Sequence, residues 1–120
     1  MRWAEKNADI RNDLRALRRA IPDTFKGFSD LSRAVRESGG LDARTKEFVA
    51  LGISVTDRCE ACIGLHVEAL VKEGASRAEV ADVLAMSVQM GGGPSLMYAA
   101  RALACFDELA GTERPPDRAT

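Results

Sequence analysis

Glycine and proline divide this 120-residue sequence into short segments, each with the periodicity of an amphipathic helix. Pro22, Gly39-Gly40, Gly74 and the run Gly91-Gly92-Gly93-Pro94 fall at the segment boundaries, where residues that start or end helices are expected. No segment shows the alternation of apolar and polar residues that is typical of a half-buried strand. The sequence therefore predicts an all-α fold.

Six helices are expected from the apolar spacing and the capping residues. Asp42 caps the third, and this cap and the segment's length favour helix over a buried strand in its apolar second half. Gly74 follows the fourth in the position where glycine ends helices, and a capping box from Ser76 to Glu79 begins the fifth. The expected ranges are about 4–20, 22–37, 42–55, 57–73, 76–90 and 94–109, with the fourth beginning at Asp57 or Arg58 and the sixth at Pro94 or Ser95.

Length and charge restrict the class of protein. We expect one domain at residues 1–110, with its core at 41–109, and a flexible polar tail at 111–120. Seventeen basic and eighteen acidic residues give a net charge of −1 without a basic stripe, which argues against nucleic acid or an anionic membrane as partner. The longest dense apolar stretch, 48–55, is too short to cross a bilayer, and the N-terminus lacks a signal-peptide pattern. We expect a cytoplasmic protein.

The residues with chemical potential gather in one stretch, Cys59-Glu60-Ala61-Cys62-Ile63-Gly64-Leu65-His66, which contains the chain's only histidine. Cysteines three apart on a helix have Cα atoms about 5 Å distant, which a disulfide tolerates. Cys62 and His66 are an i,i+4 pair, so the imidazole shares a helical face with both thiols. With Asp57 as N-cap, both cysteines lie near a helix N-terminus, where unpaired N–H groups favour thiolate. This pattern predicts a thiol redox site.

These residues also have purely structural interpretations. A zinc site needs four ligands, and beyond the cysteine pair only His66 and the distant Cys105 remain, so a metal site is not favoured. His66 alone would be interpreted as a core histidine, and Glu47 as a solvated surface charge. Cys105 lies among apolar neighbours and is interpreted as a small buried hydrophobe. Three methionines are interpreted as core residues or subunit contacts rather than as ligands: Met86, Met90 and Met97.

The stretch 41–109 resembles the carboxymuconolactone decarboxylase and alkylhydroperoxidase D superfamily, in its dithiol branch. The resemblance rests on a Leu-Asp-x-x-x-x-Glu opening, a Glu-x₁₁-Cys-x-x-Cys-x-x-x-His core and a Gly-Gly-x-Pro turn before an alanine-rich last helix. It implies an alkylhydroperoxidase D-like six-helix bundle that assembles into trimers or trimers of dimers. It also implies reduction of hydroperoxides without a bound cofactor, with regeneration by a dihydrolipoyl-type or other thiol donor such as a lipoyl protein. The decarboxylase branch typically lacks the C-x-x-C.

The resemblance also implies a role for each site residue. Cys62 matches the cysteine that is oxidised to sulfenic acid, and Cys59 matches its proton donor and resolving partner. Glu47 and His66 match the family's proton relay. Ala61 departs from the family pattern, because well-studied members often have tyrosine or histidine there to assist the relay.

Two helices of the second half are apolar around much of their circumference. Residues 84–90 and 96–106 place large apolar side chains on several faces, and six helices of this size have too little interior to cover both. We therefore expect a homo-oligomer. The favoured function is a thiol peroxidase or disulfide oxidoreductase; the alternatives are a redox-responsive oligomeric module without turnover and, less favoured, a decarboxylase-like enzyme.

Overall fold

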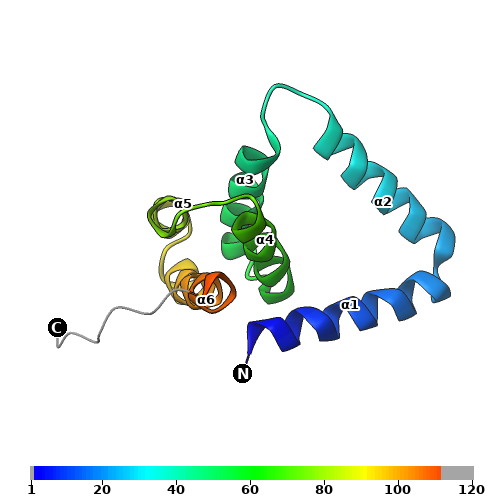
Figure 1. Cartoon of the computed structure of the whole chain (residues 1–120), viewed down its shortest axis with the longest axis horizontal. Helices are drawn as coiled ribbons and strands as arrows, with labels where there is room; N and C mark the ends of the chain where they lie inside the picture. Colours follow the sequence, from blue (N-terminus) through cyan, green and yellow to red (C-terminus); the bar gives the residue numbers. More distant parts are fainter. Residues whose placement is uncertain (1, 112–120) are drawn as a thin grey trace.

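The computed structural model describes residues 2–111, and over this range it contains six α-helices and no strand. The all-α prediction is therefore confirmed. Figure 1 shows the helices in chain order: α1 (Trp3–Ala20), α2 (Pro22–Glu37), α3 (Ala43–Thr56), α4 (Glu60–Lys72), α5 (Arg77–Gly91) and α6 (Gly93–Ala110). Beyond Gly111, the predicted tail lies outside the described residues.

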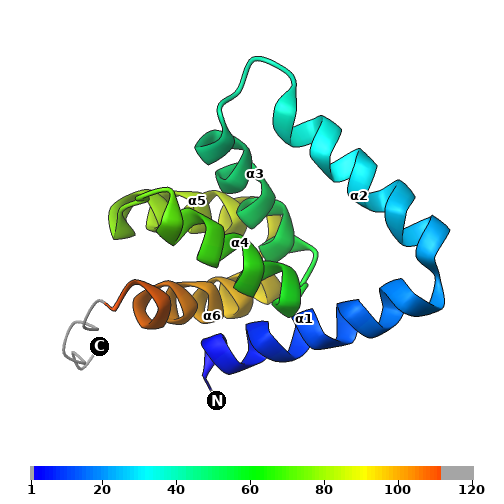
Figure 2. The same ribbon diagram turned by 45° about the vertical axis from the view of Figure 1, so that its right-hand side comes forward.

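The four C-terminal helices form the body of the molecule. Helix α3 packs against α4, α5 and α6, and α6 also packs against α4 and α5. Helix α1 contacts α4 and α6, whereas α2 meets α1 at the corner where the two helices join and stands apart from the body in both views (Figures 1 and 2). Within residues 2–111, no helix combines the length and the continuous apolar sequence that a membrane span requires.

Helix boundaries follow the capping chemistry of the sequence. The Asp42 side chain accepts a hydrogen bond from the Thr45 N–H at 2.8 Å, and α3 is helical throughout, as predicted. Ser76 and Glu79 form both hydrogen bonds of the predicted capping box at the start of α5. Gly74, just after α4, has φ +76°, a left-handed conformation that glycine adopts without steric cost. It therefore ends α4, as predicted.

The core lies between α3, α4, α5 and α6. Side chains of all four helices are completely buried there, among them Leu51, Ile63, Val67, Val80 and Cys105. The prediction for Cys105 is thereby confirmed. Because α3 and α4 each direct one apolar face into this core, the segment that joins them is held at a defined place on the body.

Helix α2 contributes no buried residue, although it has a clear apolar stripe. Several large apolar side chains elsewhere are also exposed, including Met86, Met90 and Met97 at 59%, 77% and 66%. The interpretation of these methionines as core residues is therefore wrong, because each is more than half exposed on α5 or α6. Their interpretation as subunit contacts stays a prediction.

One of the contacts between α1 and α4 is a close approach of Asn7 to Gly64. The Asn7 side-chain amide is buried and donates a hydrogen bond to the Gly64 carbonyl at 3.0 Å. A Cβ atom on Gly64 would lie 2.2 Å from the Asn7 side-chain oxygen, so only glycine permits this approach. The first half of α1 is thereby held against the helix that bears the cysteines.

We predict that Gly64→Ala lowers the free energy of unfolding by about 1–3 kcal/mol, because the added methyl group must displace Asn7. Urea unfolding followed by circular dichroism measures this change. Gly27→Ala in α2 is the matched control, since nothing lies within 4 Å of its Cβ position, and it should gain about 0.5–1 kcal/mol from helix propensity. Equal effects of the two substitutions would contradict the contact.

Candidate redox site

The cysteine pair begins α4 directly after a short turn from α3. Arg58 has φ +57°, the only positive φ of a non-glycine residue in the described range, and the Cys59 N–H donates to the Ser54 carbonyl at 3.0 Å. Cys59, not Asp57, is the N-cap of α4, and Asp57 ends α3. The predicted cap is wrong because the left-handed conformation of Arg58 interrupts the helical backbone after Asp57, so α4 begins only after Cys59.

The two sulfurs are joined in a disulfide, with Cα atoms 5.2 Å apart. This confirms the spacing argument, since an N-cap residue and the third residue of a helix are one turn apart. The Cys62 N–H donates to the Cys59 sulfur at 3.2 Å, in the place where a serine or aspartate oxygen usually caps a helix. In the reduced protein this N–H and the helix dipole would favour thiolate at Cys59.

The imidazole and the carboxylate of the predicted relay contact each other across α3 and α4. The His66 Nδ1 and a Glu47 side-chain oxygen are 2.6 Å apart. The His66 side chain is 36% exposed and the Glu47 side chain 22%, so both are partly accessible to solvent. When Nδ1–H donates to the carboxylate, Nε2 is the ring nitrogen that exchanges protons with a thiol or a substrate.

The structure thus places all four predicted site residues on two packed helices. Cys59 pairs with Cys62 and His66 pairs with Glu47. Among the described residues the imidazole has no direct hydrogen bond to either sulfur, so proton transfer between the two pairs requires a bridging water or a small movement.

Sequence reasoning missed the anchor of this turn, Glu60, which lies between the cysteines. One of its side-chain oxygens accepts from Lys6 at 2.9 Å and the other from Arg101 at 2.5 Å. The hydrogen bond from Lys6, followed by that from Arg101, lowers the pKa of Glu60 below its ordinary value of 4.5, against the opposing effect of desolvation. The first residue of α4 is therefore tied to both α1 and α6.

A hollow of about 260 Å³ lies between α1 and the cysteine turn. Its lining residues come from the stretch 3–13 of α1 together with Glu60 and Ala61. Ala61 leaves this space open, whereas a tyrosine or histidine side chain at the same position would project from the turn. The hollow is lined by both acidic and basic side chains, including Lys6, Asp9 and Asp13.

The sequence profile of the carboxymuconolactone decarboxylase family, compared with the chain, matches residues 22–104. The chain belongs to this family. The match includes every candidate site residue and begins after the end of α1. Membership of the carboxymuconolactone decarboxylase family also fits the six-helix architecture, as solved structures of relatives show.

A carboxymuconolactone decarboxylase family protein from Legionella pneumophila is 44% identical and superposes with a TM-score of 0.86, covering 90% of this chain and 96% of that one. A second family protein, from Thermotoga maritima, is 32% identical with a TM-score of 0.79, covering 88% and 91%. An involvement in antioxidative response has been suggested for the Thermotoga protein. An uncharacterized protein of Cupriavidus necator is 37% identical over 101 residues, which are 84% of this chain and 89% of that protein.

We predict that Glu60→Gln lowers the free energy of unfolding by less than about 1 kcal/mol at neutral pH, because the ion pairs of Glu60 with Lys6 and Arg101 are partly exposed to solvent. The folded-state pKa of Glu60 is lowered, so its contribution is complete above the unfolded-state value near 4.5 and disappears as the pH falls through the lower, folded value. The variant should therefore lose less stability on acidification than the wild type.

Urea unfolding between pH 7 and pH 3 tests this expectation. In a Lys6→Met background the effect of Glu60→Gln should shrink, since the main partner is gone. An undiminished effect in that background, or identical acid profiles of Glu60→Gln and the wild type, would show that the ion pair has no part in stability.

Proposed function

We propose that this protein is a thiol peroxidase that reduces organic or hydrogen peroxide through its Cys59–Cys62 pair and is regenerated by an external dithiol. The observation that carries the proposal is the placement of a disulfide-bonded, partly buried cysteine pair at the start of α4, one turn before the Glu47–His66 pair. A dithiol that closes within one helical turn needs no rearrangement of the fold to change its oxidation state.

The first step oxidises one thiol. The Cys62 thiolate attacks the terminal oxygen of the hydroperoxide, the O–O bond breaks, and the S–O bond of a sulfenic acid forms. The alkoxide leaving group takes a proton and departs as an alcohol, or as water when the substrate is hydrogen peroxide. His66, oriented by Glu47, supplies that proton after accepting the one that Cys62 loses.

The second step closes the disulfide. The Cys59 thiolate attacks the sulfur of the Cys62 sulfenic acid, and the hydroxide that leaves takes a proton to become water. The helix N-terminal hydrogen bond to Cys59 favours its thiolate form. A dihydrolipoyl-type dithiol then reduces the disulfide by two thiol–disulfide exchanges and becomes a disulfide itself.

Family membership supports this function only in part. The carboxymuconolactone decarboxylase family contains decarboxylases as well as redox proteins, so the family does not decide the reaction. The cysteine pair is the feature that favours redox chemistry, because decarboxylation uses no dithiol. Ala61 bears on the rate, since it removes a side chain that assists the relay in other members.

We predict catalytic peroxide consumption when dihydrolipoamide is supplied and recycled by a lipoamide reductase with NADH. NADH oxidation after addition of cumene hydroperoxide or hydrogen peroxide should continue for many equivalents per protein chain and disappear in Cys62→Ser. A redox-responsive module without turnover would consume one equivalent per chain and stop. That result would replace the enzymatic proposal with the sensing one.

We further predict that His66→Ala slows Cys62 oxidation by on the order of 10²-fold and that Glu47→Gln slows it less, as expected for loss of a general acid–base and of its orienting group. Stopped-flow measurement with limiting peroxide gives both rates. Glu73→Gln, at the other end of α4, is the matched control and should react at the wild-type rate. A wild-type rate in His66→Ala would return this histidine to a structural role.

The attacking thiol can be identified separately. A sulfenic-acid probe should label Cys62 in a Cys59→Ser variant after peroxide addition, and should leave Cys59 unlabelled in Cys62→Ser. Labelling of Cys59 instead is the alternative outcome, because the hydrogen bond at the helix N-terminus would stabilise a Cys59 thiolate in the reduced protein. It would exchange the roles assigned to the two cysteines.

A further inference from the structure

Glu60 lies between the two cysteines as the first residue of α4, so its carboxylate is close to the place where thiolate forms in the reduced protein. A second anion beside a first one is unfavourable, and an uncompensated carboxylate here would disfavour thiolate. The helix N-terminus and the Cys62 N–H act in the opposite direction. The thiolate fraction therefore depends on what neutralises Glu60.

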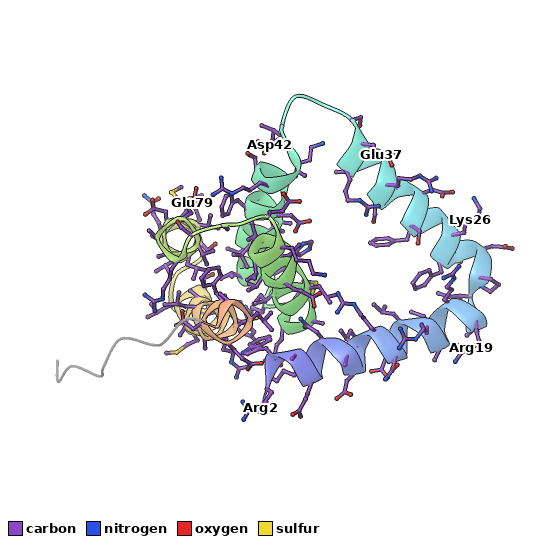
Figure 3. All side chains as sticks on the ribbon, in the orientation of Figure 1. Arg2, Arg19, Lys26, Glu37, Asp42 and Glu79 are labelled. Atoms are coloured by element: carbon purple, nitrogen blue, oxygen red, sulfur yellow. A yellow bond between two sulfur atoms is a disulfide. The ribbon has the colours of Figure 1, made fainter. Side chains whose placement is uncertain are left out.

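Two cations from different helices bind this carboxylate. The Lys6 ammonium of α1 donates to one oxygen at 2.9 Å, and the Arg101 guanidinium of α6 donates to the other at 2.5 Å. In Figure 3 the start of α1, at the labelled Arg2, lies beside α4 and α6, whereas the end of α1 at Arg19 points away from the body. Two cations and one carboxylate leave a net charge of +1 at the first turn of α4.

The Lys6 ammonium is held more firmly than the Arg101 guanidinium. Its nitrogen lies 4.4 Å from the centre of the ring of Trp3, a residue that is only 6% exposed, and the negative face of an aromatic ring attracts a cation. The Lys6 and Glu60 side chains are 26% and 35% exposed, whereas Arg101 is 57% exposed. Solvent therefore screens the charge of Arg101 more than that of Lys6.

Other charged groups around the cysteine turn, among the described residues, have less influence on the thiols. Glu47 of α3 is hydrogen-bonded to His66. Four further charged side chains are exposed, and water screens exposed charges. These four are Asp57 and Arg58 in the turn and Asp9 and Asp13 on α1. The contact of Lys6 with Glu60 is thus a partly buried ion pair directly beside the cysteines.

We propose that Lys6 and Arg101 belong to the redox site, and that through Glu60 they keep the first turn of α4 positive and so raise the thiolate fraction of the reduced cysteine pair. They are positioning residues, because they act through the carboxylate of Glu60. Glu60 and Arg101 lie within the family match, whereas Lys6 lies before it. Helix α1 therefore adds a cation to the site from outside the matched residues.

This charge affects both halves of a thiol–disulfide cycle. A dithiol whose thiolate is stabilised is favoured in its reduced form, so the corresponding disulfide accepts electrons from an external dithiol more readily. The effect on peroxide reduction rests on the function proposed above. A larger thiolate fraction then increases the rate at which Cys62 attacks the peroxide.

Charge substitutions should have effects of opposite sign. Lys6→Met leaves the turn neutral and should lower the thiolate fraction at neutral pH, whereas Glu60→Gln removes the anion and should raise it. We expect changes on the order of threefold, since partly exposed charges act through a high effective dielectric constant. Thiolate absorbance in the far ultraviolet, followed against pH in the reduced protein, measures the fraction. Cys105 does not contribute, because burial raises the pKa of its thiol to about 12.

A double variant and a matched control separate this role from a structural one. Combining Lys6→Met with Glu60→Gln restores a net charge of +1 and should return the titration close to that of the wild type. Arg11→Met removes another α1–α4 ion pair, with Glu68 farther along α4, and should leave the titration unchanged. A thiolate fraction that falls in both single variants without recovery in the double variant, or a wild-type titration in Lys6→Met, would overturn the proposal.

Equilibration with glutathione gives a second readout. Two molecules of reduced glutathione convert the disulfide into the dithiol and become oxidised glutathione, and alkylation followed by mass spectrometry counts the free thiols. At one fixed glutathione ratio, Lys6→Met should retain more disulfide than the wild type and Glu60→Gln less. Neither measurement uses peroxide, so both test the proposal even if the protein does not reduce peroxides. Peroxide turnover with unchanged thiol titrations and unchanged glutathione equilibria would keep the proposed function and overturn the role of Lys6 and Arg101.

Discussion

The packing of one stripe of α4 into the core determines the geometry of the whole site. Ile63, Val67 and Leu70 follow each other at intervals of four and three residues, and none has exposed surface. Burial of each such side chain is worth about 1.5–3 kcal/mol, more than any exposed hydrogen bond of the site contributes. Cys62 and His66 occupy the neighbouring face, so the core fixes their direction. The contact of His66 with Glu47 is then a consequence of how α3 and α4 pack, rather than its cause.

The helices could be predicted from the sequence because their ends are determined locally. Asp42, Ser76 and Gly74 each act within a few residues of their own position, so their chemistry is visible in a linear pattern. The turn between α3 and α4 was predicted wrongly because arginine rarely adopts the left-handed conformation that Arg58 has there. The stripe of α2 was visible as periodicity, but periodicity shows only that an apolar face exists and not what covers it.

The site was predictable to the extent that it is local. Cysteines three residues apart lie about one helical turn apart wherever the helix begins. The closeness of Cys59 and Cys62 could therefore be predicted although the N-cap was predicted wrongly. Glu47 lies 19 residues before His66, so their contact depends on tertiary packing, and only the family resemblance placed them in one site. The partners of Glu60 lie 54 and 41 residues away on α1 and α6. No short-range pattern in the sequence marks either of them.

The third cysteine gives the redox chemistry of this chain a defined electron count. Cys105 has no exposed surface, and burial, with a smaller effect of Glu108, raises the pKa of its thiol to about 12. Its thiolate, the reactive form, is therefore nearly absent at physiological pH. A mixed disulfide between Cys105 and either site cysteine would require the core to open. The thiol–disulfide cycle proposed for Cys59 and Cys62 would consequently exchange two electrons per folded chain, with Cys105 taking no part.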